Sequence, residues 1–315
     1  IYERQFSSRS YGFRPRRGCH DALRGAQKII DNGYIYVVDL DLERFFDTVS
    51  HSKLIEILSR TIKDGRVVSL IHKYLRSGVM NRGLFETSTE GTPQGGPLSP
   101  LLSNIMLNEL DKELESRGHP FVRYADDALI FCKSKRAAQR VKESITRFIE
   151  GQLFLKVNRE KTVVSYVQGV KFLGYSFYVM KGKCLLTVHP QSKSKMKFKL
   201  KELTSRSNGW GYECRKQKLR KYIRGWLGYY HLAQIKRLCL ETDEWLRRRI
   251  RMCIWKSWKN PKTRVANLKK CGVLDWQAYQ WGNTRLGYWR VALSRLLTFA
   301  MSNDKLRRAG YASLM

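Results

Sequence analysis

Residues 121–132 read Phe-Val-Arg-Tyr-Ala-Asp-Asp-Ala-Leu-Ile-Phe-Cys, and this stretch decides how the chain folds. Two short runs of strand-forming residues flank an Ala-Asp-Asp tip, a pattern typical of a β-hairpin with acidic side chains at its turn. Two adjacent carboxylates repel each other by about 1 kcal/mol in water and about 4 kcal/mol at an effective dielectric constant of 20. If the turn is partly enclosed, we therefore expect a cation to neutralise them, and an oxygen-rich site suits Mg²⁺.

An Asp-Asp pair is also common in ordinary turns, where its side chains cap free backbone N–H groups. A second acidic strand argues against that interpretation. Residues 34–41 read Tyr-Ile-Tyr-Val-Val-Asp-Leu-Asp, and the spacing of Asp39 and Asp41 places both on one face of a strand. Acids on a strand that ends beside an acid-tipped hairpin suit two Mg²⁺ ions about 4 Å apart, which clamp the attacking and leaving oxygens of a phosphoryl transfer.

The charge balance indicates a polyanionic partner. The chain has 315 residues, and its 60 Lys and Arg against 27 Asp and Glu give a net charge of +33, which does not suit an ordinary metabolic enzyme. Basic residues are interspersed with 8 Trp and 16 Tyr, which favours nucleic acid over an anionic membrane surface. The 7 scattered cysteines indicate reduced thiols in a cytoplasmic protein. No apolar run approaches about 18 residues, so no membrane span is expected.

Three motifs together resemble the reverse transcriptases encoded by bacterial group II introns. They are Tyr-Ala-Asp-Asp at 124–127, Asp-Leu-Glu-Arg-Phe-Phe-Asp at 41–47 and Thr-Pro-Gln-Gly-Gly-Pro-Leu-Ser-Pro at 92–100. The resemblance extends from Ser-Tyr-Gly-Phe-Arg-Pro at 10–15 to Gly-Trp-Leu-Gly-Tyr-Tyr at 225–230, which is similar to the maturase-specific segment of that family. It implies an α+β fold, with partial fingers and a right-hand polymerase palm built on an antiparallel sheet, followed by an α-helical thumb or X domain.

The resemblance implies that Asp41, Asp126 and Asp127 are the catalytic carboxylates and hold two Mg²⁺ ions. The alternation of side chains along the strand does not show whether Asp41 or Asp39 binds the metal, because both lie on the same face. The family match favours Asp41, since it places an aromatic residue five positions further on.

Four residues are implied to bind the incoming nucleotide. The backbone carbonyl of Leu42 is a candidate metal ligand, and Phe46 would lie against the ribose 2′-hydroxyl, although a core aromatic is the alternative. Gln94 and Gly95 would lie beside the templating base pair and the nucleotide. Lys161 is a candidate general acid for the pyrophosphate leaving group, with an ordinary surface lysine as the alternative.

Hydrophobic periodicity predicts a palm of strand, helices, hairpin, helix and second hairpin, followed by basic helices. The predicted domains are fingers and palm at 1–188, the thumb or X domain at 189–258, and a basic C-terminal extension at 259–315. Residues 1–19 carry five arginines around Gly and Pro, which predicts a loop lying along phosphates. In the resembled family this segment follows earlier fingers segments, which we expect to be missing here.

The segment from Pro190 to Lys270 is the most basic part of the chain. It carries 24 Lys and Arg against 5 Asp and Glu, a net charge of +19. In the helix expected at 239–258, Arg247, Arg248 and Arg249 face several directions and are candidate RNA-binding residues. A solvated basic face is the alternative, but self-repulsion on this scale favours a polyanion nearby.

The predicted function is an RNA-directed DNA polymerase that copies group II intron RNA into DNA during retrohoming and acts as a maturase in splicing. Expected partners are intron RNA, a target DNA primer and dNTPs, in a cytoplasmic bacterial ribonucleoprotein, with a homodimer as a further candidate assembly. The absence of a Cys-x-x-Cys pair argues against the zinc-binding nuclease that many family members carry. The alternatives are a splicing cofactor without polymerase activity, or a retron, diversity-generating or defence-associated reverse transcriptase.

Overall fold

The computed structural model describes residues 1–77, 79–81, 84–86, 90–92 and 96–315. The chain divides into two compact units, residues 1–185 and residues 186–315. This division falls three residues before the predicted boundary at 188, and residues 259–315 lie in the same unit as the helices that precede them. The three-domain division therefore stays a prediction.

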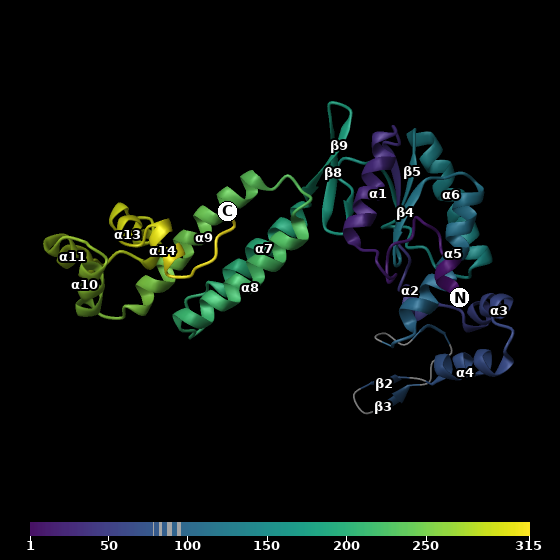
Figure 1. Cartoon of the computed structure of the whole chain (residues 1–315), viewed down its shortest axis with the longest axis horizontal. Helices are drawn as coiled ribbons and strands as arrows, with labels where there is room; N and C mark the ends of the chain where they lie inside the picture. The colour runs from purple at the N-terminus through teal and green to yellow at the C-terminus, as the bar shows by residue number, and fades with distance from the viewer. Residues whose placement is uncertain (78, 82–83, 87–89, 93–95) are drawn as a thin grey trace. The chain divides into compact units, whose positions relative to one another are not determined.

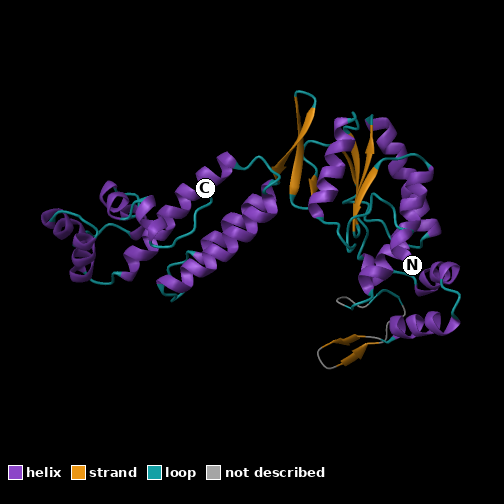
Figure 2. Cartoon of the chain, viewed as in Figure 1, coloured by secondary structure: helices purple, strands orange, loops and turns teal. Residues whose placement is uncertain are grey.

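Unit 1, residues 1–185, is built around a four-stranded antiparallel sheet with the order β4-β5-β1-β6 (Figures 1 and 2). Its strands are β1 (Tyr36–Leu40), β4 (Phe121–Tyr124), β5 (Asp127–Cys132) and β6 (Val163–Tyr166). The hairpin predicted at 121–132 is confirmed, because Phe121 pairs with Ile130 and Tyr124 with Asp127. β1 lies between β5 and β6, so the acidic strand predicted upstream runs beside the hairpin.

Strands β4, β5 and β1 are buried on both faces, which explains why they are almost continuously apolar, whereas the edge strand β6 is partly exposed. Val38 and Ile130 lie in the main core together with residues of α5 (Ser99–Ser116) and α6 (Lys135–Gln152). The opposite face buries Leu129, and α1 (Cys19–Asp31) packs against β4. Figure 1 shows α1 and α6 on opposite sides of the strands. The predicted α+β palm is confirmed.

Smaller elements complete unit 1. They are η1 (Tyr2–Arg4), α2 (Phe45–Thr48), α3 (His51–Thr61), α4 (Gly65–Arg76), β2 (Val79–Asn81), β3 (Leu84–Glu86), β7 (Lys171–Phe172) and β8 (Tyr175–Met180). Strand β9 (Lys183–Val188) begins in unit 1 and ends in unit 2. The predicted second hairpin is confirmed, because β8 and β9 are hydrogen-bonded neighbours joined by residues 181–182, and β7 adds a third strand in the order β7-β8-β9. Strands β7 and β8 are separate because Leu173 and Gly174, which lie between them, adopt φ of +50° and +80°.

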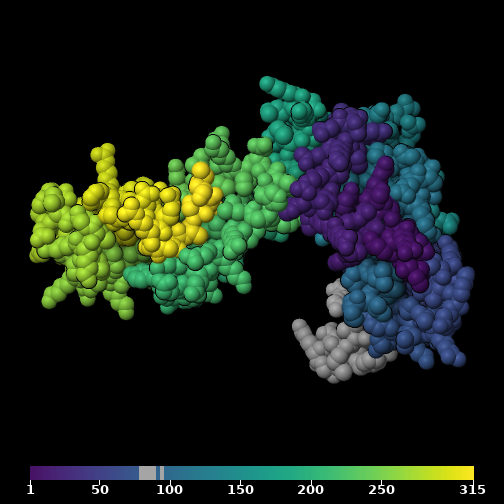
Figure 3. Space-filling model, in the orientation of Figure 1, coloured from purple at the N-terminus to yellow at the C-terminus, as the bar shows by residue number. Residues whose placement is uncertain are grey.

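The N-terminal segment, residues 1–19, is stabilised by hydrogen bonds from its own arginines. It lies at the surface next to α3 (purple and blue in Figure 3), and Arg14 is buried there. Arg14 donates to the Glu3 carboxylate at 2.8 Å and to the Ser10 carbonyl at 3.0 Å. Arg17 donates to the same Ser10 carbonyl at 3.2 Å. The prediction of a basic loop along phosphates is therefore wrong at Arg14, because its guanidinium donors are used inside the protein.

Unit 2, residues 186–315, is helical, as predicted. Its long helices are α7 (Pro190–Leu203), α8 (Tyr212–Tyr230) and α9 (Lys236–Ser257), and α7 packs against both of the others. The shorter helices are α10 (Pro261–Lys270), α11 (Asp275–Gly282), α12 (Tyr288–Val291), α13 (Arg295–Ala300) and α14 (Asn303–Arg308). Across the described ranges of both units, no helix combines the length and the apolar character needed to cross a bilayer.

Candidate active site

The predicted carboxylates gather where β1 ends beside the turn between β4 and β5. Leu40 pairs with Ala128 across the two strands, so Asp41 and Asp127, the neighbouring residues, are brought together at the same end of the sheet. Asp39 lies two residues before Asp41 and follows the same alternation. The strand pairing thus brings together acids that are about 90 residues apart in the chain.

Burial and repulsion raise the pKa of two of these carboxyl groups. The pKa of Asp127 is raised to about 7, first by burial and then by repulsion from neighbouring carboxylates, of which Asp39 has the largest effect. The pKa of Asp39 is raised to about 6, first by burial and then by the charge of Asp41. Lys171 opposes both shifts without cancelling them. The site therefore holds more negative charge than its own residues neutralise.

The donor set of this site fits a divalent cation. As the side chains stand, the described residues contain no group of three or more His, Cys, Asp or Glu that is close enough to hold a metal ion. However, Asp41, Asp126 and Asp127 supply carboxylate oxygens at adjacent strand ends, and the pKa of Asp127 is raised first by burial and then by its acidic neighbours, a combination that a bound cation would offset. Carboxylate oxygens are also the ligands that Mg²⁺ prefers.

Without divalent cations, the protein is expected to become less stable as the pH rises from about 4 to about 7. The pKa of Asp127 is about 7 in the folded protein, above its ordinary value of 3.8, so the folded state retains a proton that the unfolded chain has lost. Its contribution to stability is therefore present at low pH and lost as the pH rises through this window, by about 1–3 kcal/mol. In thermal unfolding measured in EDTA, Asp127→Asn should remove the contribution of Asp127 and leave the smaller one that the raised pKa of Asp39 makes in the same direction. Equal pH profiles for the two proteins would contradict the prediction.

The segment that follows α6 holds the backbone at Asp41. The Asn158 N–H donates to the Asp41 carbonyl at 2.9 Å, and Leu42, whose side chain is buried, forms an antiparallel bridge with Val157. Lys161 Nζ lies 3.9 Å from Asp41 Oδ2. The structure thus places the candidate general acid beside a candidate metal ligand, while the roles of Lys161 and Leu42 stay predictions.

Phe46 in α2 lies next to the loop that carries the other nucleotide-binding candidates. Its ring is half-buried against the main core, and its carbonyl accepts a hydrogen bond from the Thr92 N–H at 2.6 Å. Gly91 adopts φ of +87°, and a Cβ there would lie 2.8 Å from the Phe46 carbonyl oxygen. The start of the loop is therefore fixed beside Phe46. Gln94 and Gly95 lie outside the described residues, so their contacts stay predictions.

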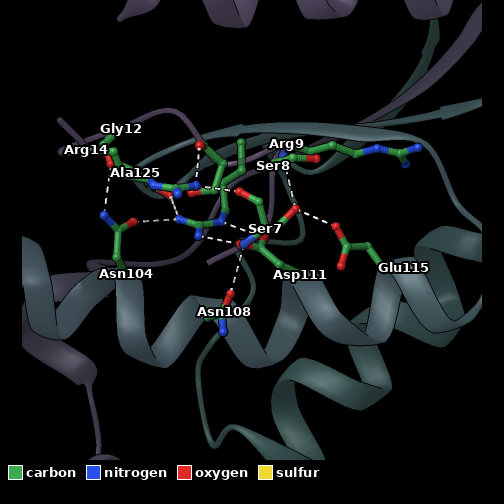
Figure 4. Close-up of polar contacts among 12 residues, drawn as sticks. Ser7, Ser8, Arg9, Gly12, Arg14, Asn104, Asn108, Asp111, Glu115 and Ala125 are labelled. Carbon is green, nitrogen blue, oxygen red and sulfur yellow. Dashed lines mark hydrogen bonds and ion pairs between the residues drawn. The ribbon is translucent and has the colours of Figure 1, made fainter. Parts of the chain in front are cut away.

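A buried polar network beneath the acidic turn was not predicted from the sequence. Arg123 donates through Nε and Nη2 to the two carboxylate oxygens of Asp111, at 2.7 and 2.5 Å. Its Nη1 donates to Asn104 Oδ1 at 3.1 Å and to the Ala125 carbonyl at 2.8 Å. Asn104 Nδ2 donates in turn to the Gly12 carbonyl at 2.9 Å. Figure 4 shows Asn104 and Asp111 on one helix below Gly12 and Ala125.

The sequence of α5 contains a signal for this network. Asn104, Asn108 and Asp111 are spaced by four and three residues, so they form a polar stripe along a helix whose other buried positions are mostly apolar. Buried polar side chains need partners, so such a stripe predicts a polar network on that face.

The three arginines predicted to bind RNA donate hydrogen bonds to other groups of unit 2. Arg247 is only 1% exposed, and its Nε donates to Asp243 at 3.1 Å. The guanidinium of Arg248 lies 3.7 Å from the ring centroid of Trp289 and donates to its carbonyl. Arg249 donates to carbonyls at the C-terminal end of α7. The structure contradicts the prediction for Arg247, because Asp243 lies one turn earlier on the same buried face of α9 and pairs with its guanidinium there.

A groove of about 820 Å³ lies between α7 and α9 in unit 2. Its lining includes the rings of Phe198 and Trp245 and the basic side chains of Lys201 and Arg206. The Phe198 side chain is 71% exposed although it is large and apolar. Exposed rings beside cationic groups are suited to stacking with unpaired bases and to contacting phosphates.

Comparison with known families identifies the class of protein. Residues 1–177, more than half of the chain, match the reverse transcriptase (RNA-dependent DNA polymerase) family. Residues 193–272 match the maturase-specific domain of group II introns. The chain therefore belongs to the reverse transcriptase family, as a member of the group II intron reverse transcriptase/maturase type. The family predicted from the sequence is confirmed.

Individual relatives agree with this assignment. Protein YkfC of Escherichia coli (strain K12) is 35% identical over 214 residues, which cover 56% of this chain and 56% of YkfC. The group II intron-encoded protein LtrA of Lactococcus lactis subsp. cremoris is 31% identical over 244 residues, which cover 57% of this chain and 41% of LtrA. The chain thus spans about half the length of these relatives. The apo telomerase structure from Candida tropicalis shares the fold, with a TM-score of 0.50 at 13% identity over 96% of this chain and 57% of that chain.

Proposed function

We propose that this protein is an RNA-directed DNA polymerase whose active site consists of Asp41, Asp126 and Asp127. The main support is the meeting of the β1 end and the β4–β5 turn, which brings these carboxylates together in a chain of the reverse transcriptase family. The helical unit contains the maturase-specific match, which supports binding of group II intron RNA and assistance in its splicing.

The proposed reaction is attack of a primer 3′-hydroxyl on the α-phosphate of a dNTP, with release of pyrophosphate. Two Mg²⁺ ions held by the three aspartates would stabilise negative charge on the attacking and leaving oxygens. Lys161, whose Nζ lies 3.9 Å from Asp41 Oδ2, would donate a proton to the leaving pyrophosphate. Phe46, fixed by Thr92, would lie against the sugar and disfavour a ribose 2′-hydroxyl.

The proposed partners follow from this reaction. Intron RNA would be both template and splicing substrate, a target DNA end would be the primer, and the protein would act within a cytoplasmic ribonucleoprotein. A homodimer is a further candidate assembly.

Primer extension tests the proposal. The protein is incubated with an RNA template, a DNA primer, dNTPs and Mg²⁺, and Asp127→Asn serves as the inactive control. We expect template-dependent DNA synthesis that requires Asp127. Binding and splicing of intron RNA without any DNA synthesis would instead identify the protein as a splicing cofactor.

The groove between α7 and α9 is expected to contact RNA phosphates. Replacing Lys201 and Arg206 with Ala should weaken RNA binding and flatten the slope of log K against log salt by up to about 1.8, since each lost phosphate contact removes roughly 0.7–0.9. Lys259 and Lys262 are exposed and do not line the groove, so their double Ala variant is a matched charge control. Equal slopes for the two double variants would place the RNA elsewhere.

A further inference from the structure

We infer that Arg123 is a positioning residue for the catalytic carboxylates, and that it acts by holding the carbonyl of Ala125 in the turn. This inference rests on the proposed function, because the turn matters for catalysis only if Asp126 and Asp127 take part in it. Arg123 itself is 1% exposed, so it is not available to the substrate.

The turn needs support because its backbone is unusual. Tyr124 pairs with Asp127, so only Ala125 and Asp126 form the connection between the two strands. Ala125 adopts φ of +57°, in the left-handed region that residues with a Cβ rarely occupy. Two-residue hairpin loops normally place glycine, asparagine or aspartate at such a position. An alanine there must be held by contacts from outside the turn.

Arg123 provides such a contact from the side of the turn that faces α5. Its Nη1 donates to the Ala125 carbonyl at 2.8 Å, while Nε and Nη2 are held by both carboxylate oxygens of Asp111. Because the guanidinium is planar and its nitrogens are fixed relative to one another, the bidentate pair with Asp111 sets the direction in which Nη1 points. The position of Asp111 therefore determines where the Ala125 carbonyl is held.

The support is rigid on both sides of the turn. Asp111 and Asn104 both belong to α5, a helix of 18 residues packed in the main core. Asn104 accepts from Arg123 and donates to the Gly12 carbonyl. Gly12 in turn lies so close to the turn that a Cβ there would be 2.2 Å from the Ala125 nitrogen. The turn is thus held between α5 and the N-terminal segment (Figure 4).

Arg123→Lys separates positioning from simple charge pairing. The lysine ammonium can still pair with Asp111, but it cannot hold both carboxylate oxygens and the Ala125 carbonyl in the same fixed directions. Residues that orient metal ligands typically change metal affinity or activity by about 10- to 100-fold when they are replaced. We expect losses of that size in both quantities. Asn104→Ala, which leaves the Arg123–Asp111 pair intact, should give a smaller loss of the same kind.

The test measures Mn²⁺ binding by electron paramagnetic resonance, together with primer extension and thermal unfolding. Wild type, Arg123→Lys, Asn104→Ala and Asp127→Asn are compared with Leu114→Ala. Leu114 is fully buried on the same helix, so its truncation lowers stability without touching the turn. Mn²⁺ binding that is lost in Asp127→Asn, weakened about 10- to 100-fold in Arg123→Lys and unchanged in Leu114→Ala would support the inference.

Other outcomes distinguish the two proposals. If Arg123→Lys binds Mn²⁺ as wild type does, or if Leu114→Ala loses as much affinity as Arg123→Lys, the positioning role is wrong. If wild type binds no more Mn²⁺ than Asp127→Asn, there is no metal site to position and the inference also fails. If Mn²⁺ binding follows the expected pattern but wild type makes no DNA, the positioning role stands and the proposed polymerase function fails.

Discussion

Asp127→Asn is expected to lower the rate of RNA-templated DNA synthesis by about 10³-fold or more, while the affinity for intron RNA stays within about twofold of wild type. The carboxylate is a candidate ligand for a metal ion whose charge stabilisation is worth several kcal/mol in a phosphoryl transfer, and each 1.4 kcal/mol is about tenfold in rate. RNA affinity depends mainly on phosphate contacts made by basic side chains, which this substitution leaves in place.

The measurement pairs single-nucleotide extension rates with filter binding of intron RNA at several salt concentrations. Asp304→Asn is the matched control, because Asp304 is exposed on α14 and its replacement changes the net charge by the same amount. A parallel loss of synthesis and RNA binding in Asp127→Asn would contradict separate sites for the two activities. Near-normal DNA synthesis by Asp127→Asn would show that Asp127 is not a catalytic residue.

Gly12→Ala is expected to reduce the rate of synthesis by about 10- to 100-fold and to lower the stability by about 1–3 kcal/mol. A Cβ at residue 12 would lie 2.2 Å from the nitrogen of Ala125 and 2.9 Å from the carbonyl carbon of Tyr124. Both atoms belong to the backbone, so the turn itself must move to relieve the overlap. A displacement of about 1 Å at reacting groups is enough for a loss of about 100-fold.

Gly151→Ala is the control for this substitution. Gly151 lies near the end of α6, where an added Cβ would meet nothing within 4 Å, so alanine should be neutral or slightly stabilising. Chemical unfolding and extension rates are measured for both variants. Wild-type activity in Gly12→Ala would show that the carboxylates tolerate movement of the turn.

Local patterns were sufficient to predict most elements of this protein. Strand-forming runs on either side of an acidic tip predicted the hairpin of β4 and β5, and helical spacing predicted helices before and after that hairpin, which include α5 and α6. These predictions succeeded because a hairpin and an amphipathic helix depend on neighbours a few residues away. The candidate carboxylates were also found from sequence, since their motifs are contiguous, and family matching agrees with the class of protein that they indicated.

The partners of the long polar side chains were not predictable in this way. Arg247 was expected at the surface but is buried against Asp243, and Arg14 was expected along phosphates but holds the N-terminal segment. Which side of a uniformly basic helix or loop faces inward depends on elements distant in the chain. Arg123 is the clearest case, because its importance depends on Asp111 in a neighbouring helix.

The sequence by itself therefore determined the class of protein, the order of its elements and the residues of its acidic motifs, because these are properties of short contiguous stretches. Only the tertiary structure showed that some of the many cations, Arg14 and Arg247 among them, are buried and donate to groups inside the protein. It also showed that the acidic turn is held by Arg123 and Gly12, since burial and hydrogen bonding are set by contacts between segments that are far apart in sequence.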